Sequence, residues 1–132
     1  MILVDTNVIS DIVTADPHWC RWSLSQMEAA SIGYALGIVD VVYAELAALY
    51  ARIEDLDDLI DGMQLEIVPM TREGLFLAAK AFEAYRDRGG ARTGVLPDFF
   101  IGAQASVLGV PLITRDAARY RTYFPKLAVM AP

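Results

Sequence analysis

The chain has 132 residues, of which 55% are hydrophobic and 21% charged, so it can fill one hydrophobic core and extensive disorder is excluded. Its single cysteine, Cys20, excludes an intramolecular disulfide and a zinc site built from cysteines. No stretch is apolar over the length that a membrane span needs, and the first residues lack the pattern of a signal peptide. We therefore expect residues 1–132 to form a single cytoplasmic domain.

Short apolar runs, which predict strands, alternate along the chain with segments of helical periodicity. In chain order we expect a strand at 1–4, a helix from Asn7, a helix from Pro17 to about Ala30, a strand at 31–39, a helix at 41–53, a strand at 65–70, a helix from Thr71 to Gly89, a helix at 99–108, a strand at 111–114, a short helix and a strand at 127–130. Strands separated by helices pair in parallel through right-handed crossovers. The sequence thus predicts an α/β fold, a three-layer α/β/α sandwich around a small parallel sheet.

Polar residues and a glycine mark several of the expected helix ends. Asp40 and Thr71 are suitable N-caps. Gly109 is expected to stop the helix at 99–108. That helix is apolar on nearly every side, which predicts a central position in the fold.

Charge is unevenly distributed along the chain. The net charge of −6 argues against a nucleic-acid partner, because affinity for phosphates comes largely from lysine and arginine. However, residues 1–79 carry three basic and thirteen acidic side chains, whereas residues 80–132 carry eight basic and four acidic ones. Such asymmetry is a hint of a charged partner, although segregation of surface charge without function is, on this observation alone, the commoner explanation.

Four acidic residues fall where the predicted strands end. Asp5 follows the first strand, Glu45 lies in the helix after the second, Asp98 begins the central helix, and Asp116 follows the fourth strand. In an open parallel sheet the functional crevice lies at the carboxyl ends of the strands. These four carboxylates can therefore converge on one edge of the sheet.

Each acid also has a structural explanation. Asp5, Asp98 and Asp116 could cap helix N-termini, which is the commoner role of a lone aspartate at such a place. Glu45 lies about 70° from the centre of the apolar stripe of its helix, at the edge of the face turned to the core. An unpaired carboxylate there is costly. Capping explains the acids one by one but gives no reason for them to meet.

Carboxylates that do meet must raise one another's pKa or bind a cation. The chain has only two lysines, and among nine arginines only Arg115 adjoins one of these acids in sequence. Ligands that are all oxygen select hard ions, so Mg²⁺ or Mn²⁺ is expected. Such an ion completes its shell with water and substrate phosphate, which favours metal-assisted hydrolysis of a phosphodiester.

Four segments of the sequence resemble the PIN domain, and within it the VapC-like ribonuclease toxins of bacterial toxin–antitoxin pairs. They are MILVDTNVIS at the start, VVYAELAAL, LPDFFIGAQAS, and LITRDAARY followed by Phe124. Together they span nearly the whole chain in the family's order. The match before Glu45 is looser than the others.

The resemblance implies a set of functional residues. Asp5, Glu45, Asp98 and Asp116 would form the catalytic acidic pocket, with Asp5 and Asp98 as direct metal ligands and the other two binding directly or through water. Two threonines, Thr6 and Thr114, would orient these carboxylates. The resemblance further implies single-stranded or loop RNA as substrate, a homodimer, and inhibition by a cognate antitoxin.

Arginines near these acids are candidate RNA contacts. Arg115, fixed by its motif, is the first choice, with Arg92 and Arg119 beside it. They could grip the RNA backbone while the metal engages the scissile phosphate. The alternative is that they are solvated charges at helix ends.

Other features are interpreted as structural. Asp11 is expected to be a solvated helix acid, and the acidic run 54–61 a wet helix face on which an antitoxin could dock. Trp19 and Trp22 are expected in the core or at a dimer contact.

Three other functions compete with the nuclease. A PIN-like module that binds RNA or a partner without cutting is one. The second, a phosphatase of the haloacid-dehalogenase type, needs a second acid where the chain has Asn7. The third, a phosphoacceptor module of the receiver type, needs adjacent acids after the first strand, which are absent.

Overall fold

A five-stranded, fully parallel sheet forms the centre of the computed structural model, which covers residues 1–132. The strand order is β3-β2-β1-β4-β5, and the strands are β1 (Ile2–Val4), β2 (Leu36–Val39), β3 (Leu65–Val68), β4 (Leu112–Ile113) and β5 (Val129–Met130). In the register, Leu3 pairs with Gly37 on one side and with Leu112 on the other. The predicted α/β architecture with a small parallel sheet is confirmed.

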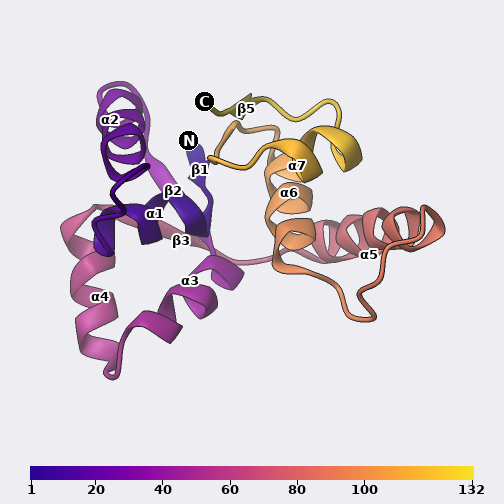
Figure 1. Ribbon diagram of the computed structural model, residues 1–132, viewed down its shortest axis with the longest axis horizontal. Helices are drawn as coiled ribbons and strands as arrows, with labels where there is room; N and C mark the ends of the chain where they lie inside the picture. The colour runs from indigo at the N-terminus through magenta and orange to yellow at the C-terminus, as the bar shows by residue number, and fades with distance from the viewer.

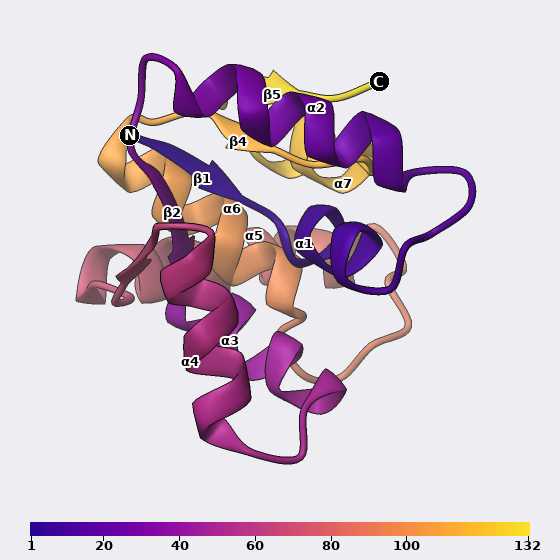
Figure 2. The same ribbon diagram turned by 90° about the vertical axis from the view of Figure 1, so that its left-hand side faces the viewer.

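Helices cover both faces of this sheet, as Figures 1 and 2 show from two directions. One layer contains α1 (Thr6–Val13), α2 (Cys20–Ser31) and α4 (Ile53–Gly62), and the other contains α5 (Arg72–Asp87), α6 (Pro97–Leu108) and α7 (Ala118–Tyr123). The short α3 (Asp40–Leu46) and the 3₁₀ helix η1 (Ala47–Leu49) follow β2. No helix combines the length and the apolar character needed to cross a bilayer.

The core explains why β1 and α6 are central. All three residues of β1 are buried, as expected of a parallel strand covered on both faces. Six of the first nine residues of α6 are buried, and Gly102 lets the ring of Phe124 approach so closely that a Cβ atom would lie 2.5 Å from it. As predicted, Gly109 ends α6 in a left-handed conformation, and Thr71 caps α5 by accepting the N–H of Gly74.

The predicted helix 41–53 is wrong, because the chain is extended at Tyr50 and Arg52. Apolar residues recur with the helical period across this break, but Leu49 and Ile53, which continue that period, are 45% and 63% exposed. The acidic run 54–61 instead lies in a separate helix, α4, whose buried side is Leu56 and Ile60.

Other boundaries also differ from the prediction, most of them by one or two residues, and the larger differences lie around α2 and β2. Only Leu36–Val39 of the expected strand 31–39 is a strand, because α2 continues to Ser31. That helix begins at Cys20 rather than near Pro17. Asp40 is not the N-cap of α3 but its first residue, and its Oδ2 accepts the N–H of Met70, which ties the chain after β3 to α3.

Candidate functional site

The four acids that the sequence singled out lie at the carboxyl edge of the sheet or on the helices that leave it. Asp5 is the N-cap of α1 directly after β1, and Asp116 lies in the turn between β4 and α7. Glu45 lies near the end of α3, and Asp98 is the second residue of α6. Asp5 is buried, Glu45 and Asp98 are half-buried, and Asp116 is exposed.

Asp5 is held by hydrogen bonds to both carboxylate oxygens. Its Oδ1 accepts the N–H of Thr6 at 2.7 Å. Its Oδ2 accepts the hydroxyl of Thr114 at 2.8 Å and that of Tyr120 at 2.9 Å. Burial and the negative charge of Asp98 nevertheless raise the pKa of Asp5 from 3.8 to about 6, because these hydrogen bonds only partly offset them.

Thr114 organises the turn that carries Asp116. While its hydroxyl donates to Asp5, its Oγ1 accepts the side-chain N–H of Asn7 at 3.2 Å and the backbone N–H of Asp116 at 3.1 Å. The hydroxyl of Thr6 binds the second acid, donating to Oε1 of Glu45 at 2.6 Å. Both threonines thus contact carboxylates of the candidate site, in the positions expected of residues that orient them.

Asp98 connects the four acids electrostatically. Its charge adds to burial in raising the pKa of Glu45 as well as that of Asp5. Burial also raises the pKa of Asp98 itself, and the charge of Asp116 adds to this effect. The acids therefore repel one another within one region, although the carboxylate of Asp116 accepts no hydrogen bond.

One guanidinium enters this region. Nη1 of Arg119 lies 3.1 Å from Oδ2 of Asp98, and this charge opposes the rise in the pKa of Asp98. No such ion pair reaches Asp5 or Glu45. The expectation that no basic side chain neutralises the acids is therefore wrong for Asp98.

The donor set suits a hard divalent cation. Every candidate ligand is a carboxylate oxygen, which Mg²⁺ and Mn²⁺ prefer. No group of three acidic or other metal-binding side chains stands close enough together to enclose an ion. Mg²⁺ does not require one, because it is usually held by one or two carboxylates and keeps several waters. The carboxylates of Asp5 and Asp98 are of the chemical type that such an ion prefers.

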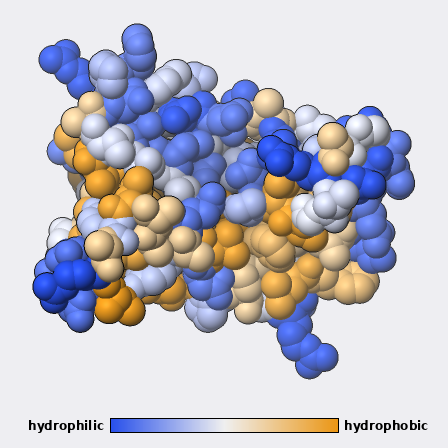
Figure 3. Space-filling view, turned by 60° about the horizontal axis from the view of Figure 1, so that its bottom comes forward, coloured by the Kyte–Doolittle hydropathy of each residue, from blue (hydrophilic) through white to orange (hydrophobic).

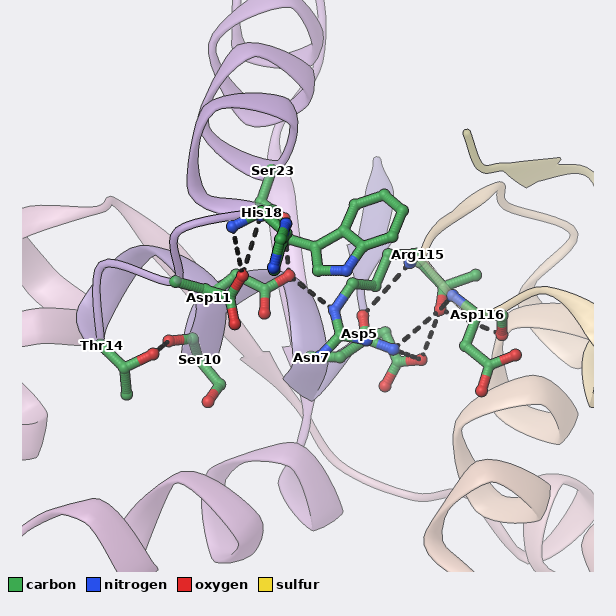
Figure 4. A network of polar contacts seen from close by, with 12 residues as sticks. Asp5, Asn7, Ser10, Asp11, Thr14, His18, Ser23, Arg115 and Asp116 are labelled. Carbon is green, nitrogen blue, oxygen red and sulfur yellow. Dashed lines mark hydrogen bonds and ion pairs between the residues drawn. The ribbon is translucent and has the colours of Figure 1, made fainter.

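A second polar network adjoins the acids and fixes the turn after β4 (Figure 4). Asp11 is 3% exposed, so its prediction as a solvated helix acid is wrong. Its Oδ2 accepts the hydroxyl of Ser23 at 3.0 Å and Nε of Arg115 at 2.8 Å. The guanidinium of Arg115 also lies 5.7 Å from the ring centre of Trp19. Arg115 thus joins the turn to α1 and α2.

The other candidate RNA contacts lie on the opposite side of the acids. Arg92 is exposed in the loop between α5 and α6, and Arg119 lines a hollow of about 340 Å³. This hollow is bounded by Tyr85, Asp98, Asp116, Ala118, Arg119, Thr122 and Tyr123. It opens beside two of the four acids.

Sequence reasoning missed Tyr120 and the role of Asn7. Tyr120 is fully buried, and burial together with the negative charges of Asp5, Asp98 and Glu45 raises its pKa well above the usual value of 10. Both residues belong to segments that the sequence analysis singled out. A tyrosine in a short helix, however, gives no sequence signal that its hydroxyl faces a carboxylate 115 residues away.

A family model described as "PIN domain" matches residues 2–125. No curated protein sequence matches the chain.

Solved structures share the fold at low identity. VapBC2 from Rickettsia felis, bound to a DNA fragment from its promoter, superposes with a TM-score of 0.76 at 18% identity, covering 100% of this chain and 99% of that one. VapBC-1 from nontypeable Haemophilus influenzae gives a TM-score of 0.74 at 18% identity, covering 99% and 98%. FitAcB from Neisseria gonorrhoeae gives 0.67 at 20% identity, covering 98% and 96%. At these identities the likeness establishes the fold.

Proposed function

The chain belongs to the PIN-domain family, and we propose that it is a metal-dependent endoribonuclease, the toxin of a toxin–antitoxin pair. The observation that carries the proposal is the buried Asp5 carboxylate at the edge of the sheet, fixed by Thr114 and Tyr120, whose pKa burial and the charge of Asp98 raise to about 6. Perturbed titratable groups in a cleft are typical of functional sites. A divalent cation relieves their repulsion, and family membership supports its use in phosphodiester hydrolysis.

In this proposal Asp5 and Asp98 bind Mg²⁺ or Mn²⁺ directly, and Glu45 and Asp116 bind it directly or through water. When bound, the ion lowers the pKa of a water and shields charge on the phosphate. Thr114 and Tyr120 hold one oxygen of Asp5 in a fixed direction, and Thr6 does the same for Glu45. Such preorganised ligands reduce the cost of binding the ion in a productive geometry.

The proposed substrate is single-stranded or loop RNA. Arg92 and Arg119 lie on the α5–α7 side of the acids and supply positive charge for the RNA backbone. Arg115, the first choice from the sequence, is one-third exposed and bound to Asp11. We therefore assign it to holding the turn that carries Asp116, with any RNA contact secondary.

Protein partners are part of the same proposal. One structure with the same fold, from Klebsiella pneumoniae, is described as a toxin–antitoxin complex, which supports an antitoxin for this chain. Large apolar side chains are exposed on α4 and α5, among them Ile53 at 63% and Phe76 at 67%, and Figure 3 shows broad apolar patches on one face. Exposed apolar surface of this kind supports protein contacts, here a homodimer and an antitoxin.

A PIN-like module that binds RNA without cutting is the second candidate. The ion pair between Arg119 and Asp98 favours it, because a guanidinium already occupies part of one proposed metal ligand. The other three acids, Asp5, Glu45 and Asp116, form no ion pair. Their charges are free to bind a metal ion, which favours the nuclease.

The test is cleavage by purified protein freed of antitoxin. We expect RNA to be cut with Mg²⁺ or Mn²⁺, and cutting to stop with EDTA. Asp5→Asn and Asp98→Asn are expected to abolish cutting in folded protein, whereas Asp61→Asn, at an exposed acid on α4, should cut normally. Cutting in EDTA, or by both site variants, would rule the mechanism out. Absence of cutting by the native protein, together with RNA binding, would favour the non-cutting module.

A further inference from the structure

The hollow beside the acids is walled by aromatic rings from separate elements. Tyr85 comes from α5 and Tyr123 from α7, and both line the hollow with Asp98 and Asp116. Its volume of about 340 Å³ lies within the range of about 300–1,000 Å³ that is typical of small-molecule sites. In Figure 1 the three helices α5, α6 and α7 come together on this side of the sheet.

The rings are held in place by mutual packing. Tyr85 and Tyr123 meet with ring centres 6.2 Å apart and planes at 72°. Both also contact the buried ring of Phe99, at 5.5 Å and 5.4 Å. Such edge-to-face and tilted contacts are favourable and restrict ring rotation. The walls of the hollow are thus organised before anything binds.

Flat cations already lie over these rings. The guanidinium of Arg88 lies 5.3 Å from the ring centre of Tyr123, and that of Arg119 lies 5.7 Å from those of Tyr85 and Phe99. Arg88 forms no ion pair, so its charge is free to face a phosphate. Aromatic rings interleaved with arginines are the pattern that binds single-stranded nucleic acid, with bases stacked on rings and phosphates held by charge.

We propose that this hollow binds one unpaired nucleotide of the RNA, with its base stacked against Tyr85 and Tyr123 and a phosphate of the strand facing Arg88. This inference rests on the proposed function, because it places that nucleotide next to the phosphate held at Asp98. Stacking tolerates every base, since each has a flat π face. The hollow therefore requires the nucleotide to be unpaired rather than a particular base, which restricts the substrate to single strands and loops.

The subsite is tested by comparing the binding of an RNA that carries bases with that of a backbone that carries none. The probes are a short oligoadenylate and an abasic ribose–phosphate backbone of the same length, bound in EDTA so that no cutting occurs and followed by fluorescence anisotropy. We expect Tyr123→Leu to weaken oligoadenylate binding about tenfold, which equals about 1.4 kcal/mol, while binding of the abasic backbone stays unchanged. Tyr123→Phe retains the ring and should bind both probes like the native protein.

Arg88→Gln is the complementary variant and should weaken binding of both probes, because it removes charge. If Tyr123→Leu weakens the binding of both probes equally, the proposal is overturned. It is also overturned if the binding of neither probe weakens. Thermal unfolding of each variant shows whether it is folded. The outcome is separate from the cleavage test: cutting without the loss specific to oligoadenylate refutes the subsite alone, and that loss without cutting by native protein refutes the nuclease alone.

Discussion

Replacing Asp5 by asparagine is expected to stabilise the metal-free protein at neutral pH. The folded protein holds the Asp5 carboxyl proton with a pKa of about 6, against 3.8 for an ordinary aspartate. The folded state thus binds this proton more tightly than the unfolded chain does. The stability that protonation contributes is fully present below pH 3.8 and is lost as the pH rises through 6. The difference between the two pKa values, 3.8 and about 6, corresponds to about 3 kcal/mol of stability.

The net gain is smaller because one hydrogen bond is lost. Asparagine can still accept the hydroxyls of Thr114 and Tyr120 through its oxygen. Its NH₂ group cannot accept the N–H of Thr6, and losing such a helix cap costs about 1 kcal/mol. Asp5→Asn should therefore unfold with a free energy about 2 kcal/mol higher than the native protein at pH 7.

Urea unfolding in EDTA at pH 4 and at pH 7 measures this effect. The difference between native protein and Asp5→Asn isolates Asp5 from the other carboxylates, and it should shrink or change sign at pH 4. Asp61→Asn, at an exposed site, should show no such difference. A variant that is about 1 kcal/mol less stable at pH 7 would refute the reasoning, since Asp5 would then be chiefly a helix cap.

Three further predictions concern the neighbours of Asp5. Mn²⁺ at about one hundred times its Kd should stabilise the native protein by about 2.7 kcal/mol, and thermal shift should show no stabilisation of Asp5→Asn. Tyr120→Phe removes the hydroxyl that donates to Asp5 Oδ2. It should lower the free energy of unfolding in urea by about 1 kcal/mol and weaken Mn²⁺ binding measured by calorimetry. Unchanged Mn²⁺ binding would contradict a positioning role for Tyr120. Arg115→Ala leaves the buried Asp11 without its cation and should lower the free energy of unfolding by about 2 kcal/mol. The loss is smaller than for a fully buried pair because Arg115 is one-third exposed. A loss under about 0.5 kcal/mol would contradict this prediction.

Topology made the fold predictable, and with it the position of Asp5 and Asp116 at one edge of the sheet. Consecutive strands joined by helices must be parallel, so their carboxyl ends share one edge wherever the strand order places them. Asp5 and Asp116, which follow β1 and β4, therefore lie at neighbouring strand ends, because these strands pair directly. Local signals also held at Thr71 and Gly109, since caps depend on residues within one turn.

Contacts between distant residues were not predictable. The pair between Asp11 and Arg115 joins positions 104 residues apart, and nothing in the spacing indicates which acid an arginine reaches. The break between α3 and α4 was missed for a related reason. Periodicity reports only that apolar residues recur, whereas Leu49 and Ile53 continue the period on exposed surface, so tertiary packing decides where the helix stops.

Helix capping and a shared site are alternative explanations of the positions of the acids, but Asp5 serves both purposes. Its Oδ1 caps α1 through the N–H of Thr6, which leaves Oδ2 to face the hydroxyls of Thr114 and Tyr120. Asp98 differs, because no side chain caps the start of α6 and its carboxylate instead faces Arg119. Capping therefore fails to account for Asp98, the acid whose charge reaches both Asp5 and Glu45. A cation at Asp98 must therefore compete with Arg119, whose guanidinium already pairs with Asp98 and lines the hollow.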